Sequence, residues 1–359
     1  MEPSLNNDLG YPILIGDDLE DELRAFARRR GPVSAMLVDA NPNLRPRIAR
    51  VRAAIAAPSP LRVALSERRK RLATVEQTLD ALLAAGVERS GLVVGAGGGV
   101  ASDLFGFACG IYMRGVEYAH VATSLVAMVD AAIGGKTGVD LRGGKNLAGT
   151  FRDPVAVFCD VSALRTLPAR AMREGLAEIV KAAIIEGGDF FEELEELAPH
   201  PLARWPWAHV IEMAVKVKTM TVADDRLEAG SRELLNLGHT FAHAIERASG
   251  FRVSHGAAVA VGLRAAGLLA LRTGRFSERE YLRVLALLTL VGLPLQIPLE
   301  PRAIFTAMGS DKKKRNGRLR FVLPRSLGDV EYGIECDPRS VRAVLAKLSQ
   351  PPGTVDARR

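Results

Sequence analysis

The stretch Leu92-Val93-Val94-Gly95-Ala96-Gly97-Gly98-Gly99-Val100 restricts the fold more than any other part of the chain. Its apolar residues predict a buried strand, and its glycines predict a tight turn into a helix over Ala101–Met113. Such a turn lets backbone amides approach a phosphate, and the start of a helix favours an anion. The match to Gly-x-Gly-x-x-Gly fails at Val100, so a purely structural turn is an equally acceptable interpretation. Asp39 ends an earlier predicted strand and could accept from a ribose hydroxyl or simply occupy a turn.

The segments around this stretch alternate between short β-rich runs and helical runs. This alternation favours a mostly parallel sheet covered by helices, an α/β domain of the Rossmann-like type. The predicted strands are Tyr11–Ile15, Ala35–Val38, Arg62–Leu65, Leu92–Val94, Ala119–Ala122 and Val155–Cys159, and the predicted helices are Leu19–Arg29, Val75–Ala85 and Ala101–Met113.

The pattern changes after Pro168, where helical segments dominate. Ser277 and Glu280 form a capping box at the start of one of them. The predicted helices are Ala171–Ile185, Pro206–Ala223, Glu233–Ser249, Ala257–Thr273, Ser277–Leu288 and Arg339–Leu348, with extended segments at Phe321–Leu323 and Val330–Tyr332. We therefore expect an α/β domain over residues 1–167 and a mostly α-helical domain over residues 168–359.

The composition is that of a globular protein and restricts its partners. The chain has 359 residues, 48% hydrophobic and 25% charged, and a net charge of +7. Aromatic residues make up only 5% and do not alternate with basic ones, which argues against nucleic-acid binding. A small anionic substrate explains the positive charge more simply.

The cysteines and the N-terminal residues predict a cytoplasmic protein. Cys109, Cys159 and Cys336 are odd in number and widely spaced, as expected of reduced thiols. The polar, acidic beginning of the chain is unlike a signal peptide. The longest apolar stretch, Ala257–Leu271, is interrupted by Arg264 and is too short to span a bilayer, so we expect no membrane association.

Three of the six histidines lie between His239 and His255 and predict a metal site. His239 and His243 are four residues apart and would share one helix face, and His255 follows Gly250, a predicted helix stop. Neutral imidazole is the commonest metal ligand in proteins. The cluster lacks the glutamate of His-Glu-x-x-His, and ordinary polar positions on a helix are the alternative.

Glu178 and Lys181 lie three residues apart on one predicted helix. They could form an exposed ion pair, which stabilises a helix only slightly. Apolar neighbours such as Ala177 and Ile179 instead favour a buried pair. A buried carboxylate requires a cation or a metal as its partner.

Two glycine turns carry lysine, at Gly134-Gly135-Lys136-Thr137-Gly138 and at Gly143-Gly144-Lys145-Asn146. The first is similar to half a P-loop, but the Walker pattern needs a glycine where this chain has Asp130. We therefore reject a nucleoside triphosphatase. Two mobile turns with cations are better suited to a smaller anionic ligand.

Taken together, these motifs resemble 3-dehydroquinate synthase and the wider family of sugar phosphate cyclases, from about Ile13 to Tyr332. The resemblance is carried by Gly97-Gly98-Gly99-Val100-x-x-Asp103-x-x-Gly106-Phe107, Met113-Arg114-Gly115, Val129-Asp130-x-x-x-Gly134-Gly135-Lys136-Thr137-Gly138, Gly144-Lys145-Asn146-Leu147, Gly175-Leu176-Ala177-Glu178-Ile179-Val180-Lys181, Asn236-x-Gly238-His239-Thr240-x-x-His243-Ala244, His255-Gly256 and Asp311-Lys312-Lys313. It implies a dehydroquinate synthase-like fold, with an NAD-binding domain over residues 1–167 and a metal- and substrate-binding domain over residues 168–359.

The resemblance also implies roles for individual residues. It places zinc, or cobalt, on Glu178, His239 and His255, and it puts His243 beside the substrate instead. The implied NAD contacts are Asp39, Asn41, Glu67, Lys70, Gly97, Gly98, Gly99, Asp103, Thr123, Ser124, Lys136, Lys145 and Thr166. The implied substrate-binding and catalytic residues are Arg114, Asp130, Lys136, Asn146, Lys181, Lys218, Arg232, Asn236, His243 and Lys312. Arg114 corresponds to a residue that reaches a neighbouring subunit, which implies a homodimer.

The implied substrate is an anionic sugar phosphate, 3-deoxy-D-arabino-heptulosonate 7-phosphate, which would be converted to 3-dehydroquinate and phosphate in the shikimate pathway. NAD would take a hydride from C5 and return it after phosphate leaves, before an aldol step closes the ring. Lysine and arginine are matched donors for the carboxylate and the phosphate, and zinc acts as a Lewis acid on hydroxyl groups.

Two other enzymes share much of this pattern. An aminodehydroquinate synthase is nearly indistinguishable by these residues, whereas Asn236 and His243 favour 3-dehydroquinate synthase over the valiolone-forming cyclases. A metal-dependent alcohol or glycerol dehydrogenase would not need so many cations. The chain departs from the usual family pattern at Ala122 and at Ala171, where a nicotinamide contact is expected and nearby Glu174 could replace it.

Overall fold

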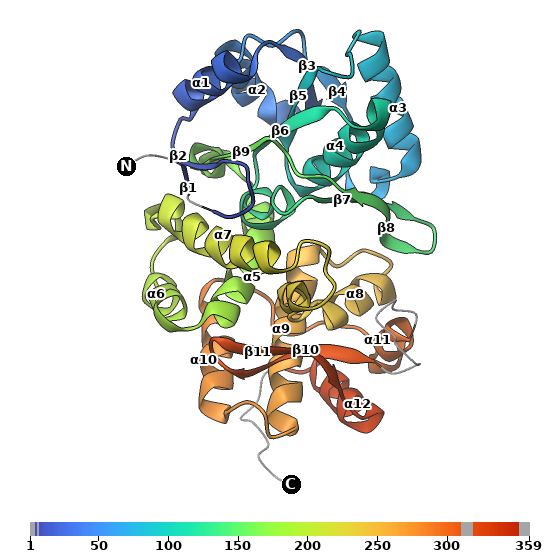
Figure 1. Ribbon diagram of the computed structural model, residues 1–359. Coiled ribbons are helices and arrows are strands. Elements are labelled where there is room, and N and C mark those ends of the chain that lie inside the picture. The colour runs from blue at the N-terminus through green and yellow to red at the C-terminus, as the bar shows by residue number, and fades with distance from the viewer. Residues whose placement is uncertain (1–3, 6, 310–318, 352–359) are drawn as a thin grey trace. The chain divides into compact units, whose positions relative to one another are not determined.

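Strand β5 (Leu92–Gly97) lies inside a seven-stranded sheet, with the order β1-β2-β9-β6-β5-β3-β4 (Figure 1). The computed structural model describes residues 4–5, 7–309 and 319–351. The strands pair in parallel, except that β1 is antiparallel to β2. The other strands are β1 (Ser4–Leu5), β2 (Ile13–Gly16), β3 (Val33–Asp39), β4 (Leu61–Val63), β6 (Glu117–Ala122) and β9 (Ala156–Asp160).

Helices cover both faces of this sheet, which confirms the predicted α/β architecture. Helices α1 (Glu20–Arg30) and α2 (Arg45–Ala54) pack on one face, and α3 (Leu72–Ala84) and α4 (Gly99–Ile111) pack on the other (Figure 1). Strand β3 shows why, because its side chains alternate between two apolar cores. Met36 and Val38 join the first core, whereas Ala35 and Leu37 join the second.

Helix α4 ends earlier than predicted, at Ile111 rather than Met113. Met113 has a φ of 48° and Arg114 a φ of 66°, so the chain leaves the helix there. The sequence predicted two glycine turns at Gly134–Gly138 and Gly143–Asn146. In the structure this region forms a two-stranded sheet instead, in which β7 (Lys136–Leu141) pairs with β8 (Gly144–Phe151). Gly138 and Gly149 face each other in its register, and a Cβ on Gly149 would lie 2.2 Å from the Thr137 carbonyl oxygen. The glycines therefore permit close strand pairing as well as turns.

The chain divides into two compact units. The first contains Met1–Met172 with Pro206–Met220, and the second contains Arg173–Trp205 with Thr221–Arg359. Most of helix α7 (Trp207–Asp224) thus groups with the sheet, whereas the sequence placed it with the later helices. The prediction that residues 1–167 bind NAD, and that residues 168–359 bind the metal and the substrate, stays a prediction.

The second unit is built around helix α9 (His255–Arg272), most of whose residues are buried. Helices α8 (His239–Ala248), α10 (Glu278–Leu290) and α12 (Pro338–Lys347) pack against it, and α8 also contacts α11 (Pro301–Met308). The unit is completed by most of α5 (Ala169–Glu186), by α6 (Gly188–Leu197) and by the hairpin of β10 (Arg320–Ser326) and β11 (Asp329–Glu335). In the described part of the chain, no helix is long and apolar enough to cross a membrane.

The single helix predicted over Glu233–Ser249 is wrong. The chain forms a 3-10 helix over Ser231–Asn236 and then begins α8 at His239. Gly238 separates them with a φ of +77°, and a Cβ there would lie 2.9 Å from the Leu263 backbone nitrogen. Only glycine fits this left-handed position so close to α9. The break makes His239 the first residue of α8.

Candidate functional site

Glu178, His239 and His255 converge in the second unit, although they come from three helices. Glu178 lies in the middle of α5, and the two histidines each begin a helix, α8 and α9. One possible ligand atom from each residue lies within 4.8 Å of the others. His255 Nε2 is 3.2 Å and His239 Nε2 is 3.6 Å from Glu178 Oε1. The two imidazoles therefore present the same nitrogen to one carboxylate.

The start of α9 is held by Glu174 on α5. The Glu174 carboxylate accepts a hydrogen bond from the Gly256 backbone N–H at 2.5 Å. A Cβ on Gly256 would lie 2.4 Å from the Glu174 Cα, so only glycine allows the two helices to approach this closely. Glu174 thus supplies the acceptor that a helix N-terminus requires and fixes the position of His255.

The charges around Glu178 stabilise its ionised form despite burial. Its side chain is only 1% exposed, and Lys181 Nζ lies 2.6 Å from Oε2. Burial alone raises the pKa of Glu178, but Lys181 and His239 outweigh it and hold the pKa well below its usual value. Lys181 and Glu178 therefore form the buried pair that the apolar neighbours predicted.

The two histidines respond differently to the same carboxylate. Burial lowers the pKa of His239, and the attraction of Glu178 does not compensate for it. Burial also acts against the charged form of His255, but hydrogen bonds to Glu178 and Glu246 raise its pKa to about 10. The two carboxylates therefore favour a positive charge on His255, whereas burial disfavours one on His239.

One carboxylate and two imidazoles form a donor set suited to zinc. Catalytic zinc sites use three protein ligands of this kind and leave a fourth position for water or substrate. Cobalt accepts the same ligands. His243 is not part of this group of three, although its ring lies 5.5 Å from that of His239. The group of three that the structure brings together therefore contains His255 rather than His243, which the spacing alone had paired with His239.

A second acidic group, Asp18, Glu20 and Asp160, lies in the first unit. Arg50 is 3.1 Å from Asp18 Oδ1 and 3.3 Å from Glu20 Oε1, and Arg47 pairs with Asp160. These guanidinium groups already supply the positive charge that the carboxylates need, which makes this group an ion-pair network.

The glycine turn after β5 leaves the start of α4 accessible to a ligand. The N-cap residue Gly98 makes no side-chain cap, so the first amides of α4 have no capping side chain. A Cβ on Gly97 would lie 2.4 Å from the Ala101 Cβ and 3.5 Å from the Asp39 Cβ. The turn is therefore as tight as the sequence predicted, and Asp39 lies beside it.

Residues from two neighbouring strands border this turn. The Thr123 N–H donates to the Gly97 carbonyl at 2.9 Å, and a Cβ on Gly98 would lie 3.0 Å from Ser124 Oγ. Asp39 Oδ1 accepts from the Asn41 N–H at 3.0 Å, and burial raises the pKa of Asp39. The arrangement combines helix amides, hydroxyls and a strand-end carboxylate, as dinucleotide sites do.

Lys70 connects α4, the helix that follows the glycine turn after β5, to the β7–β8 hairpin. It is 5% exposed, donates to Asp103 on α4 and donates to Asn146 Oδ1 at 2.7 Å. Burial opposes its charge, but Asp103 outweighs burial and raises the pKa of Lys70. Lys145 pairs with Glu67 in the same region. The contacts thus bring together Asn146 and four residues with implied NAD roles, Glu67, Lys70, Asp103 and Lys145.

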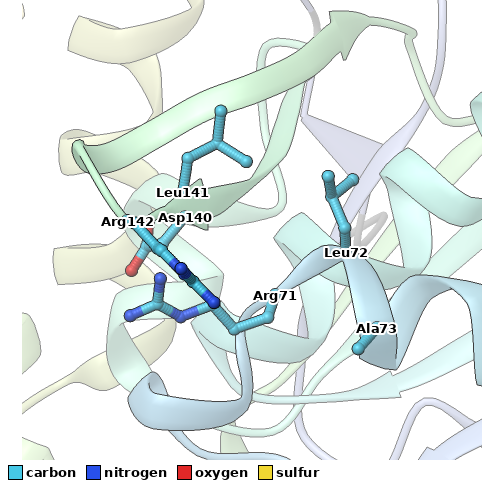
Figure 2. Close-up of a pocket in the computed structure, with 6 residues that line it drawn as sticks. All are labelled: Arg71, Leu72, Ala73, Asp140, Leu141 and Arg142. Carbon is cyan, nitrogen blue, oxygen red and sulfur yellow. The ribbon is translucent and has the colours of Figure 1, made fainter.

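An open pocket of about 600 Å³ lies next to this cluster. Arg71, Leu72 and Ala73 come from the start of α3, and Asp140, Leu141 and Arg142 from the end of β7 and the following turn (Figure 2). The Asp140 N–H donates to the Lys70 carbonyl at 2.9 Å, and its carboxylate accepts from the Asn146 N–H at 2.8 Å. Two arginines beside a helix N-terminus favour anions there.

Asp130 and Lys218 meet in the first unit. Asp130 lies in a π-helical turn over Ala127–Ala131, and Lys218 on α7 donates to its backbone oxygen at 2.6 Å and to its carboxylate. Lys218 is 9% exposed. A buried ammonium beside a carboxylate can bind an anion or transfer a proton.

Comparison with known proteins identifies the family. Residues 61–174 match the family model of the 3-dehydroquinate synthase N-terminal region, and residues 175–314 match that of the 3-dehydroquinate synthase C-terminal region. A 3-dehydroquinate synthase from Acidithiobacillus ferrooxidans (strain ATCC 53993 / BNL-5-31) is 41% identical over 355 residues, covering 95% of this chain and 97% of that protein. The chain belongs to the 3-dehydroquinate synthase family.

Solved structures support the same fold. A 2-epi-5-epi-valiolone synthase from Streptomyces hygroscopicus subsp. jinggangensis 5008, with NAD+ and Zn2+ bound, has a TM-score of 0.87 and 30% identity, over 96% of this chain and 98% of that one. A 2-deoxy-scyllo-inosose synthase complexed with carbaglucose-6-phosphate, NAD+ and Co2+ has a TM-score of 0.83 and 25% identity, over 93% and 96%. The predicted dehydroquinate synthase-like fold is confirmed.

The remaining residues singled out by the family resemblance have the following local surroundings. Arg114 is exposed after α4, Lys136 is half-buried at the start of β7, and Thr166 Oγ1 donates to the Ala163 carbonyl at 3.3 Å. Arg232 is 1% exposed and donates to the Arg226 carbonyl at 2.6 Å, and Asn236 Nδ2 donates to Glu228 at 2.9 Å. Lys312 lies outside the described residues.

Sequence reasoning did not assign a role to Glu246, although its Oε1 atom lies 3.4 Å from Nδ1 of His255 in the candidate metal site. Glu246 follows His239 by seven residues, a spacing that returns to the same face of a helix. That spacing was the available signal. Glu174 was considered only as a replacement for a nicotinamide contact, whereas its carboxylate accepts from the Gly256 N–H of α9.

Proposed function

We propose that this chain is a 3-dehydroquinate synthase. It converts 3-deoxy-D-arabino-heptulosonate 7-phosphate to 3-dehydroquinate and inorganic phosphate, as a phosphate-eliminating lyase of the shikimate pathway. The observation that carries the proposal is the convergence of Glu178, His239 and His255 in a chain about 40% identical to relatives of that name.

Glu178, His239 and His255 would hold the divalent metal. Their donor atoms and the negative charge of Glu178 fit zinc or cobalt. When bound, such an ion polarises substrate hydroxyls as a Lewis acid and makes their protons easier to remove. Lys181 keeps Glu178 ionised, and Glu174 fixes the helix start that carries His255.

The glycine turn and its neighbours would hold NAD. Gly97, Gly98 and Gly99 offer amides to the pyrophosphate, and Asp39 offers a carboxylate to a ribose hydroxyl. NAD supplies a hydride acceptor that is regenerated when the hydride returns, so the overall reaction involves no net oxidation. The other proposed NAD contacts are Asn41, Glu67, Lys70, Asp103, Thr123, Ser124, Lys136, Lys145 and Thr166.

Cationic and amide side chains would bind the substrate. Lys181, Lys218 and Arg232 are buried cations, suited to a carboxylate or a phosphate that leaves water. Lys218 also lies where it can hold or move a proton, because it donates to Asp130. Arg114, Lys136, Asn146, Asn236, His243 and Lys312 complete the proposed substrate-binding and catalytic set.

Arg114 suggests that the working form is a homodimer. It is exposed, and its φ of 66° directs the chain away from α4. Exposed apolar side chains, Ile111 and Met113, stand beside it at 41% exposure each. We propose that this surface faces a second copy of the chain and that Arg114 acts in the partner's site.

A phosphate-release assay tests the proposal. We expect release from 3-deoxy-D-arabino-heptulosonate 7-phosphate that stops after chelation and returns with zinc or cobalt. Faster release from its amino analogue would indicate an aminodehydroquinate synthase, and release from sedoheptulose 7-phosphate would indicate another sugar phosphate cyclase. Steady accumulation of NADH with a simple polyol would favour a metal-dependent alcohol or glycerol dehydrogenase.

A further inference from the structure

Glu246 lies on the opposite side of His255 from Glu178. It belongs to the last turn of α8 and is 2% exposed. Its Oε1 atom is 3.4 Å from His255 Nδ1, whereas His255 Nε2 is 3.2 Å from Glu178 Oε1. The imidazole of His255 is therefore placed between two buried carboxylates, with one ring nitrogen toward each.

A histidine that binds a metal through one nitrogen needs an acceptor for the N–H on the other. When a metal replaces the Nε2 proton of His255 and the Nδ1–H is directed at Glu246, the Nε2 lone pair points to the same place as the Glu178 carboxylate. His239 has the same arrangement with a neutral acceptor, because its Nδ1 lies 3.2 Å from the Leu237 carbonyl oxygen. Both ring orientations are thus set by contacts at Nδ1.

The position of Glu246 is electrostatically unfavourable unless it has a specific partner. Burial of a carboxylate requires compensation by hydrogen bonds or opposite charge. The last turn of a helix adds to the penalty, because the helix dipole is negative there. The Phe251 N–H and the Ser249 hydroxyl both donate to the Glu246 backbone oxygen rather than to its carboxylate. The contact with His255 provides a specific reason for an acidic side chain here.

We propose that Glu246 is a positioning residue for the metal site. It orients His255 so that Nε2 faces the metal, and its negative charge makes that nitrogen a stronger ligand. This inference rests on the proposed function, since it requires that Glu178, His239 and His255 bind a metal.

Metal affinity tests this role without using turnover. In metal-free full-length protein, zinc binding is measured by competition with a chelator, and the geometry is followed by the visible spectrum after cobalt is added. Glu246→Gln retains an acceptor for Nδ1–H but loses the charge, and Glu246→Leu loses both. We expect Glu246→Gln to weaken zinc binding by about 10- to 100-fold, and Glu246→Leu to weaken it more and to alter the cobalt spectrum.

Glu196→Gln is the matched control, because it removes one glutamate charge from an exposed position on α6 in the same unit. Unfolding of the metal-free proteins is compared to separate loss of metal binding from loss of fold. If Glu246→Leu does not fold, Glu246→Gln alone decides the result.

Zinc affinity within twofold of the parent and an unchanged cobalt spectrum in Glu246→Gln would overturn the role of Glu246 and leave the proposed function intact. A parent protein without zinc affinity would overturn both.

Discussion

His255 Nε2 lies 3.2 Å from Glu178 Oε1, although 77 positions separate the two residues in the chain. The contact depends on the Glu174 cap, which fixes the start of α9, and on Gly256, which allows α9 to approach α5. Lys181 supports it from the other side by compensating the buried charge of Glu178. The candidate metal site therefore depends on how α5, α8 and α9 pack, and not only on its three proposed ligands.

This geometry separates the roles of the two histidines on α8. His239→Ala removes a nitrogen from the group of three and should weaken zinc binding by more than the roughly 10- to 100-fold typical of residues behind the ligands. His243→Ala should keep the metal and lose turnover. Zinc content per chain and phosphate release are measured on the same samples. Loss of zinc from His243→Ala would show that the ligand set is wrong.

Lys218 is expected to act in turnover rather than in folding. Lys218→Met removes the ammonium that donates to Asp130. A hydrogen bond to a charged group contributes about 1.5–3 kcal/mol, so kcat/KM should fall by about 10- to 100-fold or more. Lys216→Met is the control, because Lys216 is exposed on the same helix and pairs with Glu212. Equal activities of the two variants would exclude a role for Lys218 in the reaction.

A substitution in the glycine turn after β5 should have an effect that a second substitution reverses. Gly97→Ala would place a Cβ 2.4 Å from the Ala101 Cβ, so the start of α4 must move. We expect weaker NAD binding by titration and a loss of about 1–3 kcal/mol in the free energy of unfolding. Adding Ala101→Gly removes the atom that clashes and should restore NAD binding, with Ala101→Gly alone as the reference. Failure of the double variant to recover would mean that the clash is not the cause.

The local pattern of the sequence predicted the sheet and the glycine turn at Gly97–Gly99. The family resemblance, and not the local pattern, named Glu178, His239 and His255, which the structure brings within 4.8 Å of one another. A buried strand followed by glycines has few structural alternatives, and the family resemblance selected His255 over His243. The helix break at Gly238 was missed, because apolar periodicity continues across it. It arises from the close approach of α9, which the residues around Gly238 do not encode.

The β7–β8 hairpin and Glu246 were missed for a similar reason. Gly134–Asn146 has the composition of two loops, and its pairing depends on contacts between segments such as Thr137 and Thr150. Glu246 is one acidic residue on an amphipathic helix until α9 brings His255 beside it. When the role of a residue depends on a distant segment that approaches it in the folded chain, a single sequence carries only a weak signal of that role.

His120 on β6 should make stability depend on pH. Burial lowers its pKa to about 4, from an ordinary value of 6.5. Between these values the unfolded chain binds a proton that the folded chain excludes, so stability rises with pH across this window and is lost as pH falls. The shift corresponds to about 3 kcal/mol at most.

Urea unfolding at a series of pH values from about 4 to 7 measures this effect. His120→Asn cannot titrate and should flatten the dependence of the unfolding free energy on pH. His200→Asn, at an exposed position, should leave it unchanged. A parent-like slope in His120→Asn would assign the pH dependence to other groups.

Arg264 is expected to stabilise the second unit without a role in the reaction. It lies on α9, is 3% exposed, and donates to the backbone oxygens of Lys347 and Gln350 at 3.0 Å each and to that of Leu295. It thereby ties α9 to the end of α12. Arg264→Met leaves these carbonyls without their donor, and each buried unsatisfied group costs about 1–3 kcal/mol. We expect a loss of at least about 3 kcal/mol in the free energy of unfolding by urea, and zinc affinity should not change.

Arg272→Met removes an exposed arginine from the same helix and should stay within about 0.5 kcal/mol of the parent. Arg264→Lys keeps a cation with fewer donors and should fall between the two. Equal stabilities of Arg264→Met and Arg272→Met would mean that the ends of α9 and α12 are held by apolar packing alone.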